Sequence, residues 1–156
     1  MAVELALYQP DIPQNTGTLM RLSACLGFRL HIIHPTGFTW SPTALRRSGM
    51  DYLADARIQE HDSFRQFEDW RHEESRRLVL LTTGGDMDVY RFAYRKSDVL
   101  MAGRESAGVP AEVARSSDAR VRIKMRAGLR SINVAVAASM VIGEAMRQTE
   151  GFDGLI

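Results

Sequence analysis

The sequence predicts an α/β protein in which a mostly parallel sheet is flanked by helices on both faces. Short apolar runs that are typical of buried strands alternate along the chain with segments whose apolar residues recur at helical spacing. Glycine, proline and capping residues separate the two kinds of segment. The chain has 156 residues, of which 45% are hydrophobic, so we expect one domain, residues 1–156, with a sizeable core.

The expected strands are of two kinds. Four short apolar runs are typical of strands that are buried on both faces, as in a parallel sheet. They are residues 3–8, 30–33, 78–81 and 99–102. A fifth segment alternates apolar and basic residues, with Val121, Ile123 and Met125 apolar and Arg122 and Lys124 basic. This alternation predicts a strand with one more solvent-exposed face.

The expected helices follow from capping residues and apolar stripes. Asn15 comes after the loop at residues 9–14 and is expected to cap a helix that Gly27 would end. Asp62 or Ser63 would cap another helix, whose apolar stripe is Phe64, Phe67 and Trp70. Three more helices are expected, at residues 42–47, from Pro110 onward, and at residues 133–147.

The last of these helices is apolar nearly all round. A chain of 156 residues has trouble burying such a helix on every side by itself. A homodimer interface is the simplest explanation, and packing within the core is the alternative.

Composition and missing motifs exclude several classes of protein. The formal net charge is +1, so any nucleic-acid site must be a local basic patch. Because Cys25 is the one cysteine, an internal disulfide and a cysteine-based zinc site are excluded, which fits a reducing compartment. Signal-peptide and membrane-span patterns are missing, since the uncharged run at residues 131–143 is too short, so we expect a cytoplasmic protein.

Phosphate-loop, dinucleotide-binding and nucleophile-elbow motifs are also missing. Gly103 and Gly108 have the spacing of a phosphate loop, but Val109 follows where a lysine is needed. The four histidines lack the spacing of a metal pair, so we expect no metal and no metal-dependent hydrolysis.

Three groups of residues stay as candidate sites. Asn15 and Arg21 follow the first strand, where the alternative is a helix cap with a surface arginine. Glu105 lies between two glycines in a loop after a buried strand, where an ordinary turn is the alternative. The third group, before the last helix, comprises Arg126, Arg130, Ser131 and Asn133.

The third group belongs to a basic segment. Residues 115–130 hold six basic side chains and one acid, Asp118. Such a segment suits phosphate groups, although a solvated strand edge followed by a helix cap is the commoner explanation.

Four stretches, in this order and separation, carry a resemblance over residues 3–149. They are LALYQPDIPQNTGTLMRLSACLGFRLHIIHP, LLTTGG, LMAGRESAGVP and IKMRAGLRSINVAVAASMVIGEAMRQ. Together they resemble the TrmH-like branch of the SPOUT RNA methyltransferases. Within that branch the sequence is most similar to the small single-domain tRNA (cytidine/uridine-34)-2′-O-methyltransferases.

The resemblance implies more than the residues alone could. It implies an α/β fold whose C-terminal segment threads a trefoil knot and holds S-adenosyl-L-methionine. It also implies a homodimer with residues of both subunits in each site, and transfer of a methyl group to the wobble ribose in a tRNA anticodon stem-loop. Neither a membrane nor a metal is implied as a partner.

By position, the resemblance assigns roles to particular residues. Arg21 is the catalytic candidate and shares the first family motif with Asn15. The second motif contains Glu105, and the third contains Ser131 and Asn133, which are further catalytic candidates. The cofactor would contact Leu81, Gly103, Ile123 and Ser131, while Arg126 and Arg130 would contact RNA phosphates. Because a guanidinium stays protonated, we expect Arg21 to bind a phosphate beside the target ribose, and the proton acceptor stays open.

The sequence departs from the family pattern at three places. Ala102 stands where a bulky aromatic residue is common, Lys124 where a proline is frequent, and Gly143 precedes Glu144 where a tyrosine is usual. The first two would reshape the cofactor pocket, and the third would affect nucleotide preference.

Three other functions stay open: a ribosomal RNA methyltransferase, a catalytically silent RNA-binding dimer, and an α/β protein that binds another nucleotide.

Overall fold

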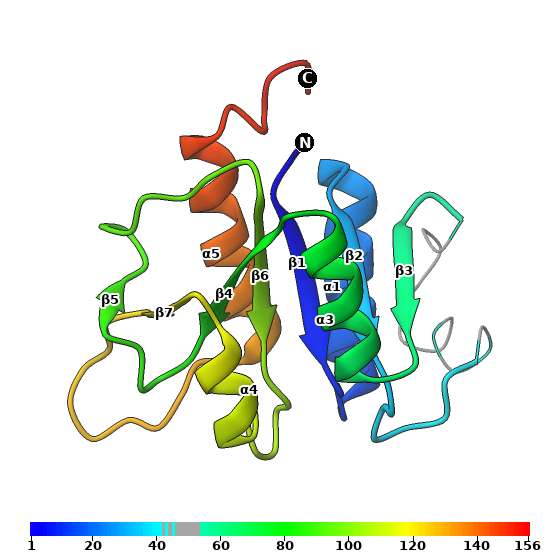
Figure 1. Cartoon of the computed structure of the whole chain (residues 1–156), viewed down its shortest axis with the longest axis horizontal. Helices are drawn as coiled ribbons and strands as arrows, with labels where there is room; N and C mark the ends of the chain where they lie inside the picture. Colours follow the sequence, from blue (N-terminus) through cyan, green and yellow to red (C-terminus); the bar gives the residue numbers. More distant parts are fainter. Residues whose placement is uncertain (42, 44, 46–53) are drawn as a thin grey trace.

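The computed structural model describes residues 1–41, 43, 45 and 54–156, which form a parallel sheet between two layers of helices. The seven strands of the described part lie in the order β3-β2-β1-β6-β4-β7-β5, and every pair is parallel. They are β1 (Glu4–Tyr8), β2 (Arg29–Ile33), β3 (Arg57–His61), β4 (Arg77–Leu81), β5 (Met87–Asp88), β6 (Asp98–Ala102) and β7 (Ala119–Arg122). The predicted α/β class is therefore confirmed (Figure 1).

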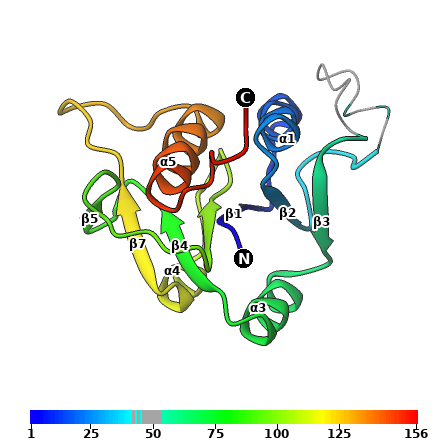
Figure 2. The ribbon, with the colours of Figure 1, turned by 90° about the horizontal axis from the view of Figure 1, so that it is seen from above.

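Helices cover both faces of the sheet. They are α1 (Pro13–Leu26), α3 (Phe64–Glu73), α4 (Ala111–Ser116) and α5 (Val134–Gln148). Figure 2 shows α1 and α5 over one face and α3 and α4 over the other. The helix expected at residues 42–47 lies outside the described residues, apart from Thr43 and Leu45.

The alternation of side chains along the strands builds two cores. Leu5 and Leu7 of β1 face the larger cluster, which includes Leu19 of α1 and Ile142 of α5. Ala6 and Tyr8 face the smaller cluster around Phe67 of α3. Because both faces are covered, the inner strands are mostly apolar, as the sequence predicts, although Glu4, His31 and Asp98 on them are buried as well.

Two expectations about the ends of elements are wrong. Helix α1 begins at Pro13, which suits the first helical position because it lacks an N–H, so Asn15 lies within the first turn and does not cap it. Strand β7 ends at Arg122, because its neighbours end opposite it: Leu81 pairs with Val121, and Asp88 pairs with Arg122. Ile123 and Met125 therefore lie beyond the sheet.

Other ends are confirmed. Gly27 ends α1 in the left-handed conformation with φ 78°, Ser63 caps α3 by accepting a hydrogen bond from Gln66 N–H, and Asn133 caps α5. Strands β3 and β5 were not predicted, since β3 is a polar edge strand and β5 has only two residues.

The strand order reverses between β1 and β6. From β1 the sheet grows through β2 to β3 on one side, while β6, β4, β7 and β5 lie on the other. In open α/β sheets ligands bind outside the carboxyl ends of the strands at such a reversal. This is the edge at which the candidate site lies.

Candidate active site

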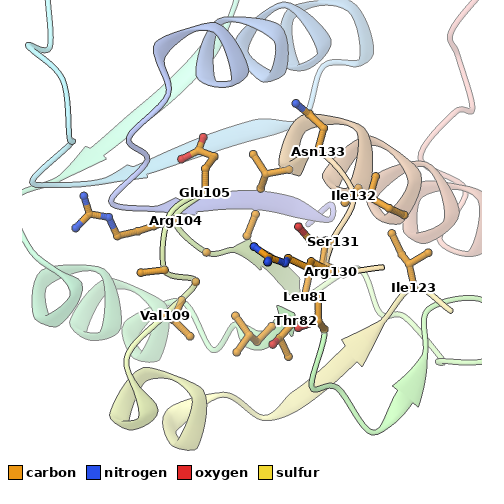
Figure 3. A pocket seen from close by; sticks show the side chains of 18 of the residues that line it. Leu81, Thr82, Arg104, Glu105, Val109, Ile123, Arg130, Ser131, Ile132 and Asn133 are labelled. Carbon is orange, nitrogen blue, oxygen red and sulfur yellow. The ribbon is translucent and has the colours of Figure 1, made fainter. Parts of the chain in front are cut away.

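A cavity of about 550 Å³ opens at the carboxyl ends of β4 and β6. Its walls come from the ends of these strands, from the loop between β6 and α4, from residues 123–133 and from the starts of α1 and α5. Figure 3 shows Leu81, Thr82 and Ile123 toward one side of the cavity and Glu105 and Asn133 toward the other.

The loop between β6 and α4 is closed on itself by two glycines. Arg104 N–H donates to the Gly108 carbonyl at 2.9 Å, and Gly108 N–H donates to the Arg104 carbonyl at 2.8 Å. A Cβ on Gly103 would lie 2.8 Å from Gly108 Cα, and Gly108 has φ 64°, so both positions require glycine. The tight loop brings its backbone to the cavity and holds Glu105 at the rim.

A chain of hydrogen bonds joins the three elements at the rim. Asn133 Oδ1 accepts from the backbone N–H groups of Ala135 and Val136, which is how it caps α5. Its Nδ2 must then face outward, and it donates to Asn15 Oδ1 at 3.1 Å. Asn15 Nδ2 in turn donates to Glu105 Oε1 at 3.4 Å, so the direction of the whole chain is set by the helix backbone.

Asp11 links this chain to the loop before α1. Its backbone N–H donates to Glu105 Oε2 at 2.9 Å, and its carboxylate accepts a hydrogen bond from the Ser106 hydroxyl. Arg104 Nε lies 3.6 Å from Asp11 Oδ2. Asp11 therefore binds three consecutive residues of the glycine loop.

The two neighbouring acids differ in proton affinity. Burial raises the pKa of the Glu105 carboxyl, and contact with the Asp11 side chain raises it further. For Asp11, the contact with Glu105 lowers the pKa, and Ser106 and Arg104 act in the same direction. Glu105 is therefore the group that takes up a proton first.

The structure brings most of the predicted site residues together. Leu81, Gly103, Ile123 and Ser131, the predicted cofactor contacts, all line the cavity. So do the candidates Asn15, Glu105, Asn133 and Arg130.

Two predicted residues are not part of this wall. Arg21 is exposed on α1, and Arg126 is exposed in the segment between β7 and α5. Neither belongs to the described lining of the cavity.

The sequence reasoning missed Asp11, Thr82 and Thr83. Thr82 and Thr83 line the cavity, and Asp11 contacts Glu105. Their one signal was position, since Asp11 lies four residues before Asn15 and both threonines directly follow a buried strand. Polar side chains after buried strands of a parallel sheet meet at one edge.

The cavity at the strand reversal and the directed chain of polar groups at its rim define an α/β enzyme with a site for a small molecule. A family model described as the SpoU rRNA Methylase family matches residues 2–143. The chain belongs to this family.

Curated relatives match over nearly their whole length. A tRNA (cytidine(34)-2′-O)-methyltransferase of Ancylobacter novellus is 55% identical over 152 residues, which cover 97% of this chain and 96% of the relative. A protein of the same name from Escherichia coli K12 is 40% identical, over 99% of this chain and 98% of the relative.

Solved structures have the same fold. One described as giving insights into the 2-OH methylation of C/U34 on tRNA has a TM-score of 0.88 at 38% identity, over 94% of this chain and 95% of the other. The SpoU methyltransferase AviRb of Streptomyces viridochromogenes, in complex with the cofactor AdoMet, has a TM-score of 0.83 at 25% identity. That match covers 94% of this chain and 60% of AviRb.

Proposed function

We propose that this protein is an S-adenosyl-L-methionine-dependent tRNA 2′-O-methyltransferase that acts on the ribose of nucleotide 34, a cytidine or a modified uridine, in the anticodon loop. The observation that carries the proposal is the directed chain from Asn133 through Asn15 to Glu105 at the rim of the cavity. Two relatives of nearly the same length, both named tRNA (cytidine(34)-2′-O)-methyltransferase, support the choice of substrate.

The cavity fits the cofactor in size and in the character of its walls. Its volume of about 550 Å³ lies within the usual range of small-molecule sites. Leu81 and Ile123 offer apolar walls, while the closed loop at Gly103 and the polar Ser131 offer backbone and hydroxyl groups. These four residues would hold S-adenosyl-L-methionine, which supplies a methyl group on a positively charged sulfur.

The chain's own residues would then orient the RNA. Arg130 at the rim and Arg126 nearby would bind phosphates, since both lie in the basic segment before α5. Arg21 would bind the phosphate beside the target ribose and stabilise the negative charge that develops on the 2′-oxygen.

A homodimer explains the position of Arg21. The side chain is exposed on α1 and does not belong to the described lining of its own cavity, so we assign it to the cavity of a second copy. Exposed apolar side chains near the rim, Ile12 and Val136, are available for such an interface. The proposal includes one methyltransferase domain over residues 1–156, a trefoil knot around the cofactor and a cytoplasmic location.

Metal ions and membranes have no part in the proposal. Within residues 1–41, 43, 45 and 54–156 no group of three or more His, Cys, Asp or Glu side chains could hold a metal ion. In the same residues no helix is both long enough and apolar enough to cross a bilayer.

Transfer of a labelled methyl group from S-adenosyl-L-methionine to total tRNA tests the function. The tRNA is taken from cells that lack this protein, so that its target is unmodified. Wild-type protein should label the tRNA, and Arg21→Ala should lose on the order of 10²-fold or more in rate because charge stabilisation is removed. A folded wild type that binds the cofactor and leaves this tRNA unlabelled would contradict the proposal.

A further inference from the structure

The described wall of the cavity holds few groups that could accept a proton. Among its residues Glu105 is the one carboxylic acid, and none is a histidine, lysine, tyrosine or cysteine. The other charged side chains are Arg104 and Arg130, whose guanidinium groups stay protonated. Methylation of a 2′-hydroxyl requires the loss of its proton, so this inventory matters for the reaction proposed above.

The surroundings of Glu105 leave it able to accept another hydrogen bond. Each carboxylate oxygen accepts one, Oε2 from Asp11 N–H and Oε1 from the Asn15 amide. Two oxygens with about four lone-pair sites therefore keep capacity for a hydroxyl donor. The side chain is half-buried at the rim and lies on the same side of the cavity as Asn133 (Figure 3).

We propose that Glu105 accepts the proton of the ribose 2′-hydroxyl and that Asp11 is the positioning residue that holds it in place. The proposal rests on the 2′-O-methyltransferase function. The hydroxyl oxygen forms its bond to the methyl carbon as the carbon–sulfur bond breaks, which leaves a neutral thioether. The hydroxyl proton passes to the Glu105 carboxylate, so charge and atoms balance.

The charges around Glu105 favour this role. Asp11 faces it from the loop before α1, and Arg104, its neighbour in the glycine loop, pairs with Asp11. Arg130 also lines the cavity, whereas Arg21, the charged residue of α1, does not belong to its described lining. Burial and Asp11 raise the pKa of Glu105 toward the working pH, where a general base is most effective.

Single-turnover rates of methyl transfer between pH 5 and pH 9 test the proton acceptor. Glu105→Gln should lower the rate on the order of 10²-fold or more, while cofactor affinity and the KM for tRNA stay near the wild-type values. A wild type that is inactive on every RNA would remove the proposed function and this role with it. An active wild type with an equally active Glu105→Gln would overturn this role alone.

A second variant separates proton transfer from the hydrogen-bond chain. A glutamine at position 105 must place its amide N–H groups against a donor, either Asp11 N–H or Asn15 Nδ2. The double variant Asn15→Asp with Glu105→Gln reverses one contact, so that the introduced amide donates to the introduced carboxylate and every donor again has an acceptor. We expect restored thermal stability with a rate that stays low, and recovery of the rate would overturn the proposal.

Asp11→Asn tests whether Asp11 acts on the pKa of Glu105. The readout is the position of the rate profile on the pH axis, which does not depend on how fast the variant is. Loss of the neighbouring negative charge should lower the pKa of Glu105, so the acidic limb of the rate profile should move to lower pH. Carbon-13 NMR titration of labelled glutamate carboxyls, assigned with Glu105→Gln, should show the same shift in the protein without substrates. An acidic limb and a titration that both coincide with the wild type would contradict the role of Asp11.

Discussion

Asn133 uses both ends of its side-chain amide, and this decides the polarity of the site. Its oxygen is bound by two backbone N–H groups at the start of α5, so its nitrogen is the end that reaches Asn15. Asn15 cannot turn its amide round without placing its oxygen against the Glu105 carboxylate. A residue that looks like a simple helix cap therefore sets the orientation of the rim.

Two substitutions at Asn133 should separate the cap from the chain. Asn133→Asp keeps the acceptor for α5 and adds a negative charge at a helix N-terminus, so stability should stay at or above the wild-type value. The second carboxylate oxygen of the aspartate would face Asn15 Oδ1, and the hydrogen bond between these two residues would be lost. Methyl transfer should therefore fall about tenfold, which corresponds to the loss of roughly one hydrogen bond. Asn133→Ala should lose activity and about 1 kcal/mol of stability. Thermal unfolding and methyl-transfer rates measure both, and full activity of Asn133→Asp would contradict the account.

At the scale of elements, the edge of the sheet beneath α3 holds a buried polar cluster. His31 on β2 contacts Glu4 Oε2 through Nε2 at 2.7 Å and His61 Nε2 through Nδ1 at 2.9 Å. Because Glu4 can only accept, His31 carries its proton on Nε2 and His61 donates to Nδ1. Arg76 also pairs with Glu4, at 2.8 Å. His31 and His61 therefore have structural roles in this cluster.

The cluster predicts a loss of stability in acid. Burial lowers the pKa of His31 and lowers that of His61 to about 4. Burial alone would raise the pKa of Glu4, but contacts with His31 and Arg76 lower it overall. Below about pH 6.5 both histidines bind protons in the unfolded chain but stay neutral in the folded protein, so the free energy of unfolding falls as pH falls toward 4. The slope is up to about 1.4 kcal/mol per pH unit for each proton.

Urea unfolding at several pH values measures this slope. His61→Gln keeps an N–H donor for His31 but cannot titrate, so its stability should fall less steeply between pH 6.5 and pH 4. The same slope in both proteins would show that His61 does not carry the effect.

The elements that the sequence predicted well are those with a local cause. The sequence predicts Gly27 as the end of α1 and offers Asp62 or Ser63 as the cap of α3, and the structure has Gly27 and Ser63 in these roles. The last helix is expected from Asn133 onward, and the structure has Asn133 as its cap. The local sequence cannot reveal the partners of Asn15, because Glu105 and Asn133 are 90 and 118 residues away in the chain. The end of β7 depends on the strands beside it, so its own alternation could not reveal it.

At the scale of the whole molecule, one edge of the sheet collects residues from distant parts of the sequence. The reversal between β1 and β6 places the start of α1, the glycine loop and the start of α5 around one cavity. The order of motifs predicted most of this wall, whereas the contacts of Asp11 with the glycine loop appear only in three dimensions. Arg21 does not belong to the described wall, and in our proposal a second copy brings its own Arg21 to the cavity.

Val136→Asp tests that second copy. The Val136 side chain is 52% exposed near the start of α5. A charge there should leave the stability of a monomer unchanged but should destabilise an apolar interface. We expect a shift toward monomer in sedimentation velocity and loss of methyl transfer, with cofactor affinity and fold measured alongside. Val136→Thr, which is similar in shape, is the matched control. A monomeric wild type with full activity would contradict the dimer.

The position of the transferred methyl group decides whether the protein acts on the ribose of nucleotide 34. After reaction with wild-type protein, tRNA from cells lacking it is digested and its fragments are mapped by mass spectrometry. We expect one new 2′-O-methyl group, at nucleotide 34, that does not form with Arg21→Ala. A methyl group on a base, or at another ribose only, would contradict it.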